Sequence, residues 1–165
     1  MSNIEMLCDK KNIYLIKKYD ENEDDIYELY FECNYNKTSN LFEMIKQNEF
    51  EKLLYELNKD IFISCNRVNK CINYKLNDII NDKNIVNLNL RVCKLNMDDN
   101  NISFTYLDND NIVSFEYMNF TFKMIKNKIS VHLSVKFETD ISIASDVMMF
   151  LYKKCLYRLK KYIEL

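Results

Sequence analysis

Five cationic side chains gather near the end of the sequence: Lys153, Lys154, Arg158, Lys160 and Lys161. On a helix they fall on one arc, opposite an arc of apolar residues. Such an arc can neutralise phosphate groups, so it is a candidate patch for nucleic acid or another anionic surface. Cations near the C-terminus of a helix are also favoured by the helix dipole alone. We therefore expect a mainly solvated face and keep anion binding as the alternative.

Other residue types that could do chemistry are isolated. His132 is the only histidine, so a histidine-rich metal site is excluded. The acidic run Asp20–Asp25 resembles the start of a calcium loop, but Asp25 stands where that loop needs glycine. Asp108 and Asp110 lie in a segment with the composition of a hairpin turn. We therefore predict no catalytic residue, no cofactor and no metal ion.

The sequence contains neither glycine nor proline. Without glycine there is no glycine-rich phosphate loop, no dinucleotide fingerprint and no nucleophile elbow, because each needs a backbone approach that a Cβ atom blocks. This absence removes much of the nucleotide-dependent enzyme repertoire and favours a protein that is not an enzyme. It also predicts that asparagine or aspartate fills every left-handed turn position.

The composition predicts one globular domain over residues 1–165, since 48% of the residues are hydrophobic and 29% are charged. The net charge of −2 does not favour bulk attraction of polyanions. With 23 asparagines and only three arginines, the composition follows AT-rich codons. Genomes of large DNA viruses, among others, have that bias, so the chain is interpreted as a candidate viral protein.

The expected compartment is intracellular and cytoplasmic, which means the host cytoplasm or the virion if the source is viral. No uninterrupted apolar run has the length of a signal peptide or of a membrane-spanning helix. The six cysteines include no C-x-x-C pair. They are expected to be free thiols that pack as small apolar side chains.

Alternating apolar residues predict six strands, over 12–19, 26–35, 84–95, 102–107, 112–125 and 129–137. The last four are joined by short loops and therefore form an antiparallel meander. A phase shift at Met118–Asn119 predicts a β-bulge. Residues 61–76 fit either two short strands around Val68–Asn69 or one strand with an irregular link.

Helical spacing between residues 40 and 58 predicts one helix or two short ones, with capping-box patterns at Asn40–Glu43 and Asn48–Glu51. The segment 141–165 predicts a long helix with a wide apolar arc. The arc consists of Val147, Met148, Leu151, Tyr152, Cys155, Leu156, Leu159, Tyr162 and Ile163. Burying these side chains would contribute on the order of 15 kcal/mol before entropy, so the helix should dock on the sheet.

Together these elements predict an α+β fold. It has an antiparallel β-sheet of about six to eight strands, one or two central helices, and a long C-terminal amphipathic helix packed on the sheet. The element order resembles the helix-grip layout of START-like ligand-binding domains, and also that of phosphotyrosine-binding and pleckstrin-homology modules. The resemblance is one of topology, and no family motif transfers a functional residue to this chain.

The leading functional hypothesis is a non-enzymatic binding or structural protein that acts through a surface or through a cavity between helix and sheet. Its partner would be another protein, a second copy of the chain or a small apolar ligand. The alternative is an accessory nucleic-acid-binding factor that uses the basic arc of the last helix. An enzyme should show a cleft with shifted titratable groups, a carrier an apolar cavity, and a protein-binding module an exposed apolar patch.

Overall fold

A computed structural model of the chain describes residues 4–19, 25–35, 40–77, 85–109, 111, 115–138 and 142–165. Within these residues, nine strands form one antiparallel sheet in the order β1-β2-β3-β9-β8-β7-β6-β5-β4. The strands are β1 (Ile4–Lys10), β2 (Ile13–Tyr19), β3 (Asp25–Asn34), β4 (Phe62–Val68), β5 (Cys71–Asn77), β6 (Ile85–Met97), β7 (Asn101–Asp108), β8 (Phe115–Ile125) and β9 (Lys128–Phe137). The pairing of β3 with β9 joins the first strands to the last one.

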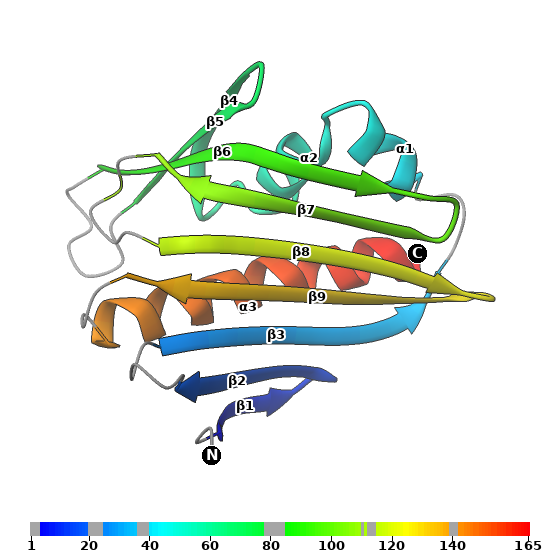
Figure 1. Cartoon of the computed structure of the whole chain (residues 1–165), viewed down its shortest axis with the longest axis horizontal. Coiled ribbons are helices and arrows are strands. Elements are labelled where there is room, and N and C mark those ends of the chain that lie inside the picture. Colours follow the sequence, from blue (N-terminus) through cyan, green and yellow to red (C-terminus); the bar gives the residue numbers. More distant parts are fainter. Residues whose placement is uncertain are drawn as a thin grey trace.

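Helices cover one face of this sheet (Figure 1). The helix α3 (Ser142–Glu164) lies behind the centre of the sheet, whereas α1 (Leu41–Lys46) and α2 (Phe50–Leu57) lie behind β6 and β7. Helix α3 packs on β2, β3 and α2, and α2 packs on β4. The predicted α+β fold, with a long C-terminal helix on an antiparallel sheet, is confirmed.

The core forms where the alternating apolar side chains of the strands meet the helices. In β9, the five inward residues Ile129–Phe137 are all buried, and the residues between them are half-buried. Phe50 of α2 packs edge-on against Phe104, Phe120 and Phe122, each with ring centroids 5.5 Å apart. Phe120 and Phe122 are therefore core residues.

Helix α3 docks through the apolar arc that its spacing predicts, with a small rotation. Its fully buried members are Met149, Tyr152, Cys155, Leu156, Leu159 and Ile163. Val147, Met148, Leu151 and Tyr162 are only half-buried, and Met149 lies outside the predicted arc. Asp146 fixes the start of the helix, because it accepts hydrogen bonds from Tyr27 and, at 3.3 Å, from Lys17.

The strand prediction differs from the structure at two places. The sheet has nine strands in the described residues, more than the expected six to eight, because β1 was not predicted. It is an edge strand whose register shifts between Met6 and Cys8, so its apolar residues do not alternate. In β8 the bulge lies at Glu116, not at Met118–Asn119, which turns Met118 inward and leaves Tyr117 half-buried. Residues 112–114 of this predicted strand lie outside the described residues.

The ambiguous segment forms two strands, β4 and β5, and the region from 40 to 58 forms two helices. Neither capping box forms. Asn40 is the N-cap of α1 without a side-chain cap, and α2 begins after Glu49 rather than Asn48. The reason is that Asn48 adopts a left-handed conformation, with φ of 61°.

Left-handed turn positions are filled by asparagine in most, but not all, cases. Among the described residues, Asn12, Asn40, Asn48 and Asn69 have positive φ, and so do Lys11 and Lys126. The prediction that only asparagine or aspartate fills left-handed positions is therefore wrong for Lys11 and Lys126. Both lie in tight hairpin turns, where strand pairing offsets a conformational cost of roughly 1–2 kcal/mol for each lysine.

The docking of α3 predicts a large effect of truncating its central side chain. We expect Leu159→Ala, at a site with no exposed surface, to lower the free energy of unfolding by about 2–5 kcal/mol. Leu165→Ala, at a site 79% exposed, should change it by less than about 0.5 kcal/mol. Urea unfolding monitored by circular dichroism measures both. Equal stability of the two variants would contradict a docked helix.

Candidate functional site

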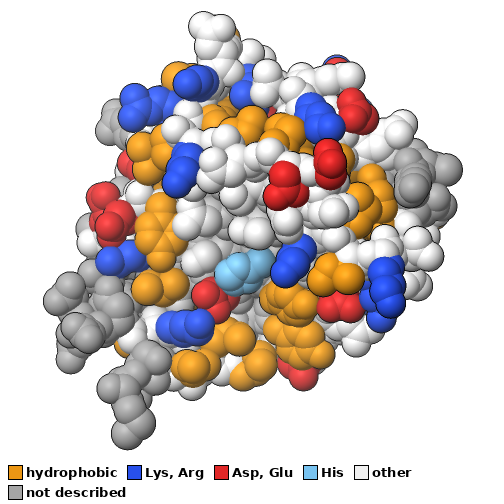
Figure 2. Space-filling view, turned by 45° about the vertical axis from the view of Figure 1, so that its right-hand side comes forward, with side chains coloured by type: hydrophobic (Ala, Val, Ile, Leu, Met, Phe, Trp, Pro, Cys, Tyr) orange, Lys and Arg blue, Asp and Glu red, His pale blue; other side chains and the backbone are white. Residues whose placement is uncertain are grey.

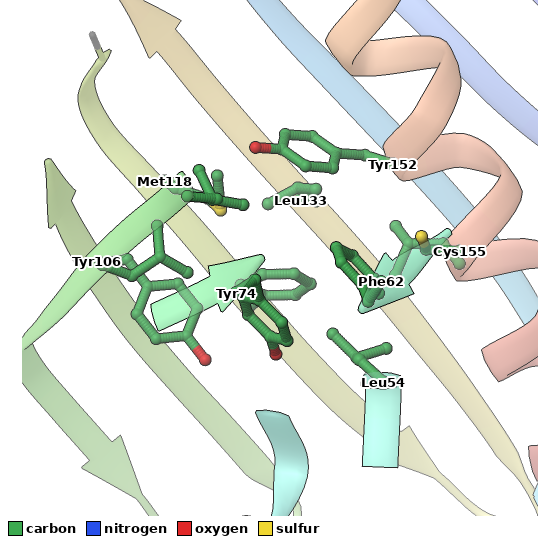
Figure 3. Close-up of a pocket in the computed structure, with 12 residues that line it drawn as sticks. Leu54, Phe62, Tyr74, Tyr106, Met118, Leu133, Tyr152 and Cys155 are labelled. Carbon is green, nitrogen blue, oxygen red and sulfur yellow. The ribbon is translucent and has the colours of Figure 1, made fainter. Parts of the chain in front are cut away.

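An apolar cavity lies between α3, α2 and the inner face of the sheet (Figure 3). Its volume is about 40 Å³. The residues around it come from both helices and from six strands: Leu54, Phe62, Tyr74, Leu88, Leu90, Tyr106, Met118, Phe120, Leu133, Tyr152, Cys155 and Leu156. None of these side chains is charged, so the cavity is suited to an apolar ligand.

One side of the cavity is lined by Tyr152. The residue is only 8% exposed. Figure 3 shows its hydroxyl group pointing toward Met118. Burial raises the pKa of Tyr152, so the phenol stays neutral and can donate or accept one hydrogen bond.

Another side of the cavity is closed by two tyrosines whose hydroxyl groups point to one side (Figure 3). Tyr106 donates to Glu51 Oε1 at 2.6 Å, and Tyr74 donates to the backbone oxygen of Glu51 at 2.8 Å. Arg67 binds the same Oε1 at 2.7 Å. Burial is the main cause that raises the pKa of both phenols, so they remain hydrogen-bond donors.

Sequence reasoning did not find this polar cluster. It interpreted Glu51 as a capping residue, and it did not single out Arg67, Tyr74 or Tyr106. The available signal was the position of Glu51 on the apolar side of a short helix, between Phe50 and Leu53, which are both buried. A carboxylate at such a position needs a buried partner, but the sequence does not show that β4 supplies it.

Polar contacts connect α3 to the turn between α2 and β4, beside the cavity. Arg158 binds both carboxylate oxygens of Asp60, with Nη2 2.8 Å from Oδ2, and donates to Asn58 Oδ1 at 3.0 Å. This bidentate contact lowers the pKa of Asp60 to about 2. It connects α3 to the segment that carries Leu54 and Phe62 of the cavity wall.

The structure distributes the five predicted cations among different environments. Arg158 and Lys154 both approach Asp60, Lys154 at 3.7 Å. Lys160 is not on a solvated face, because it is 7% exposed and lies 2.6 Å from Glu164. Lys161 is 5.5 Å from the ring centroid of Tyr157, and Lys153 is half-buried. An anion-binding role for this set stays a prediction.

The remaining candidates do not assemble into a site. His132 lies on the outer face of the sheet, with Nε2 3.7 Å from Glu28 Oε1. Asp108 accepts hydrogen bonds from Asn111, as a turn residue does, while Asp110 and Asp20–Asp24 lie outside the described residues. In the part of the chain that is described, no group of three or more potential ligands could hold a metal ion.

The six cysteines are free thiols in different settings. Cys33 and Cys155 are buried as expected, and Cys8 and Cys65 are half-buried. The expectation of burial is wrong for Cys71 and Cys93, which are exposed. Both lie on strands near the β4 edge of the sheet, where helices do not cover the outward side chains.

The outer face of the sheet mixes apolar and charged side chains (Figure 2). A groove of about 620 Å³ beside the β8–β9 hairpin is lined by Tyr30, Glu32, Asn34, Lys123, Ile125, Lys126, Asn127, Lys128 and Ser130. Its charges are partly compensated, since Lys128 lies 3.7 Å from Glu32. Within the described residues, no helix is both long enough and apolar enough to cross a membrane.

Several solved structures resemble this chain in three dimensions. The human StarD13 (DLC2) lipid transfer and protein localization domain matches with a TM-score of 0.67 and 11% identity, over 99% of this chain and 90% of that chain. Human StAR-related lipid transfer protein 5 matches with a TM-score of 0.67 and 5% identity, over 98% and 86%. The major latex-like protein 151 from Panax ginseng matches with a TM-score of 0.52 and 11% identity, over 84% and 95%.

These likenesses show that the chain shares the fold of START-type domains, as the element order suggested. No protein-family model matches the sequence, and no curated protein matches it. At identities this low the comparisons establish the fold alone. The interpretation as a viral protein gains no support from them and stays a prediction.

The contact between Arg158 and Asp60 predicts a pH-dependent contribution to stability. Because the pKa of Asp60 is lowered in the folded state, the contribution is present above about pH 4 and is lost as the pH falls toward 2. Asp60 is largely exposed, so we expect Asp60→Asn to cost only about 0.5–1 kcal/mol at pH 6 and almost nothing near pH 2. Urea unfolding of the parent and of Asp60→Asn across this pH range measures the difference in stability.

A matched control is Asp99→Asn, which removes an exposed carboxylate on the β6–β7 hairpin. The free energy of unfolding of this variant should stay close to that of the parent protein at every pH from 6 to 2. If the difference in unfolding free energy between the parent and Asp60→Asn does not decrease on acidification, the ion pair with Arg158 does not explain the contribution of Asp60 to stability.

Proposed function

We propose that this protein is a non-enzymatic carrier of a small apolar ligand, which it holds in the cavity beneath α3. The observation that carries the proposal is the cavity itself: it is lined entirely by uncharged side chains and lies between the helix and the inner face of the sheet. The surface that faces the cavity is apolar throughout, as suits an apolar ligand. The similar human structures include a lipid transfer and protein localization domain and a lipid transfer protein.

The titratable groups around the cavity favour binding over catalysis. Burial raises the pKa of the thiols of Cys155 and Cys65, to about 12 and about 11. A thiol with a raised pKa is a poor nucleophile, because the thiolate is the reactive form. The phenols of Tyr74, Tyr106 and Tyr152 are likewise held neutral. These thiols and phenols around the cavity therefore include no activated nucleophile.

The ligand must open the cavity further, because about 40 Å³ holds only a few atoms, whereas pockets for drug-sized ligands span roughly 300–1,000 Å³. Two features allow expansion. Met118 is an unbranched side chain that repacks easily. On the helix side, the wall is divided between α3 and the α2–β4 segment, which contact each other partly through the exposed Asp60–Arg158 pair.

The competing hypotheses have less support in the described structure. A nucleic-acid role would need the basic arc free, but Arg158 and Lys154 are occupied by Asp60. A protein-binding role would need a broad apolar patch, whereas the exposed apolar side chains form small groups, such as Ile4 and Met6 on β1 and the cross-strand pair Tyr14–Tyr30. Neither hypothesis has a feature comparable to the cavity.

Filling the cavity tests the proposal. We expect the parent protein to bind the neutral fluorescent probe N-phenyl-1-naphthylamine, and Cys155→Leu to weaken that binding about tenfold or more by occupying the void. The folded state should keep its stability or gain from the added apolar burial. Fluorescence titration is free of tryptophan emission, since the sequence has no tryptophan.

The control is Cys71→Leu, which makes the same chemical change at an exposed position. It should bind the probe as the parent does. Absence of probe binding to the parent, or equal binding by Cys155→Leu, would refute the cavity as the ligand site.

A further inference from the structure

The strands β4, β5 and β6 carry charge of one sign only. These strands and the turn that joins β4 to β5 contain no aspartate or glutamate, although the chain has 25 acidic residues. Their cations are Arg67, Lys70, Lys75, Arg91 and Lys94. Arg67 is bound to Glu51, whereas the other four side chains are exposed. We call these four, Lys70, Lys75, Arg91 and Lys94, the sheet cations.

The register of the strands places the sheet cations on the face that no helix covers. Lys75 of β5 and Arg91 of β6 alternate with buried residues of the inner face. After the bulge in β6, Lys94 pairs with Thr105, which lies between two buried residues of β7. Lys70 lies in the turn between β4 and β5. Figure 2 shows this outer face, with Lys and Arg side chains gathered toward its upper edge, where Figure 1 places β4 and β5.

The sheet cations differ from the other cations of the outer face in having no carboxylate partner among the described residues. Over β2, β3, β8 and β9 the charges are paired, in the contacts Lys18–Glu28 at 2.7 Å, Lys136–Glu116 at 3.0 Å and Lys128–Glu32 at 3.7 Å. Paired charges cancel at a distance, whereas unpaired charges of one sign attract a polyanion. The outer face is therefore cationic on the β4 side and balanced on the other side.

The carboxylates that border this surface do not enter it. Asp108 pairs in register with the buried Leu90, so it lies toward the inner side of the sheet. Asp98 and Asp99 lie in the turn between β6 and β7, where Asp98 accepts hydrogen bonds from backbone N–H groups of the same turn. The cationic surface ends at that turn.

Asparagine side chains lie between the cations. Asn66, Asn73 and Asn89 form one row across β4, β5 and β6. Nδ2 of Asn73 donates to Oδ1 of Asn89 at 2.7 Å and lies 3.3 Å from Oδ1 of Asn87. These contacts leave the Nδ2 groups of Asn87 and Asn89 as donors with no partner among the described residues. Amides can bind the sugars and base edges of nucleic acid, whereas a surface that enters a lipid bilayer places apolar side chains beside its cations.

We propose that the outer face of β4, β5 and β6 binds single-stranded nucleic acid, with the sheet cations at the phosphates and the asparagines beside the sugars and bases. The inference is independent of the carrier function, because the cavity lies on the inner side of the sheet. A duplex hides its base edges in grooves, whereas a single strand can turn its bases toward the amides.

The length of the surface fits a short stretch of one strand. Lys75 stands opposite Asn87 of β6, and from Asn87 to Lys94 the strand extends roughly 24 Å at about 3.4 Å for each residue. A stacked nucleic-acid strand advances by about 3.4 Å for each nucleotide, so the surface spans roughly seven nucleotides. This length lies within the range of about 4–16 nucleotides that single-strand-binding domains cover.

Fluorescence anisotropy of labelled oligo(U) and oligo(dT), each about 20 nucleotides long, tests the inference on the intact protein. The two probes share the phosphodiester backbone and differ in the 2′-hydroxyl, so binding of either supports the inference and a preference identifies the sugar. We expect the affinity to fall about 50-fold between about 50 and 200 mM salt, as four neutralised phosphates imply. Lys75→Glu/Arg91→Glu/Lys94→Glu should weaken binding about tenfold or more at the lower salt concentration.

The matched control is Lys153→Glu/Lys154→Glu/Lys161→Glu, which changes the net charge by the same amount on the basic arc of α3. It should bind the oligonucleotides within about threefold of the parent protein. If this control loses binding while the variant of the sheet cations retains it, the basic arc is the binding site and the inference is wrong.

A neutral variant guards against misfolding of the charge-reversed protein. Lys75→Gln/Arg91→Gln/Lys94→Gln keeps polar side chains at three exposed positions and should still weaken binding about fivefold or more. Circular dichroism checks that both variants are folded. Unchanged affinity of a folded neutral variant would contradict the assignment of these cations.

Two further measurements can overturn the inference. A parent protein that binds neither oligonucleotide at the lower salt concentration, or that binds a duplex of the same length more tightly than the single strand, refutes it. Sedimentation with vesicles of phosphatidylcholine and phosphatidylserine tests a lipid surface as the alternative. Vesicle binding that depends on the sheet cations, without oligonucleotide binding, assigns the face to anionic lipid and shows that the inference is wrong.

Discussion

The burial of one face of a nine-stranded sheet by a single long helix is the constraint on which the rest of the structure depends. The inner face presents apolar side chains from β2 across to β5, and α3 with the short α1 and α2 excludes water from it. Helix α3 packs on the sheet mainly at β2 and β3. The cavity lies where α3 and α2 together face the strands β4 to β9.

Two polar contacts set the position of this helix, and they differ in kind. Near its start, Asp146 meets Tyr27 and Lys17, and Lys17 is only 5% exposed. Near its end, Arg158 meets Asp60 at the surface. The first contact is shielded from water on the Lys17 side, although 38% of the Asp146 side chain is exposed, whereas the second is an exposed pair that exchanges with solvent at little cost. Motion of α3 is therefore expected at the Arg158 end, which is the end nearer to Phe62 and Cys155 of the cavity wall.

The sequence predicted those features that depend on neighbouring residues in the chain, and it missed those that depend on contacts between distant residues. Strands such as β9, with its clean alternation, and the apolar arc of α3 follow from side-chain periodicity, and the fold class followed from their order. Strand β1 could not be predicted, because a bulge interrupts its period and an edge strand has little burial to reveal. The role of Glu51 was not predicted for another reason. Its partners, Arg67 and Tyr106, are 16 and 55 residues away in the sequence and become its neighbours only in the folded structure. For the same reason the sequence did not show Asp60 as the partner of Arg158, while the anion-binding role of the basic arc stays a prediction.

The small size of the cavity is informative about how a ligand would be held. A void of about 40 Å³ destabilises the folded state by on the order of 1 kcal/mol, at about 24 cal/mol for each Å³. A ligand that fills the void removes this penalty, and the gain offsets part of the work of separating α3 from the α2–β4 segment.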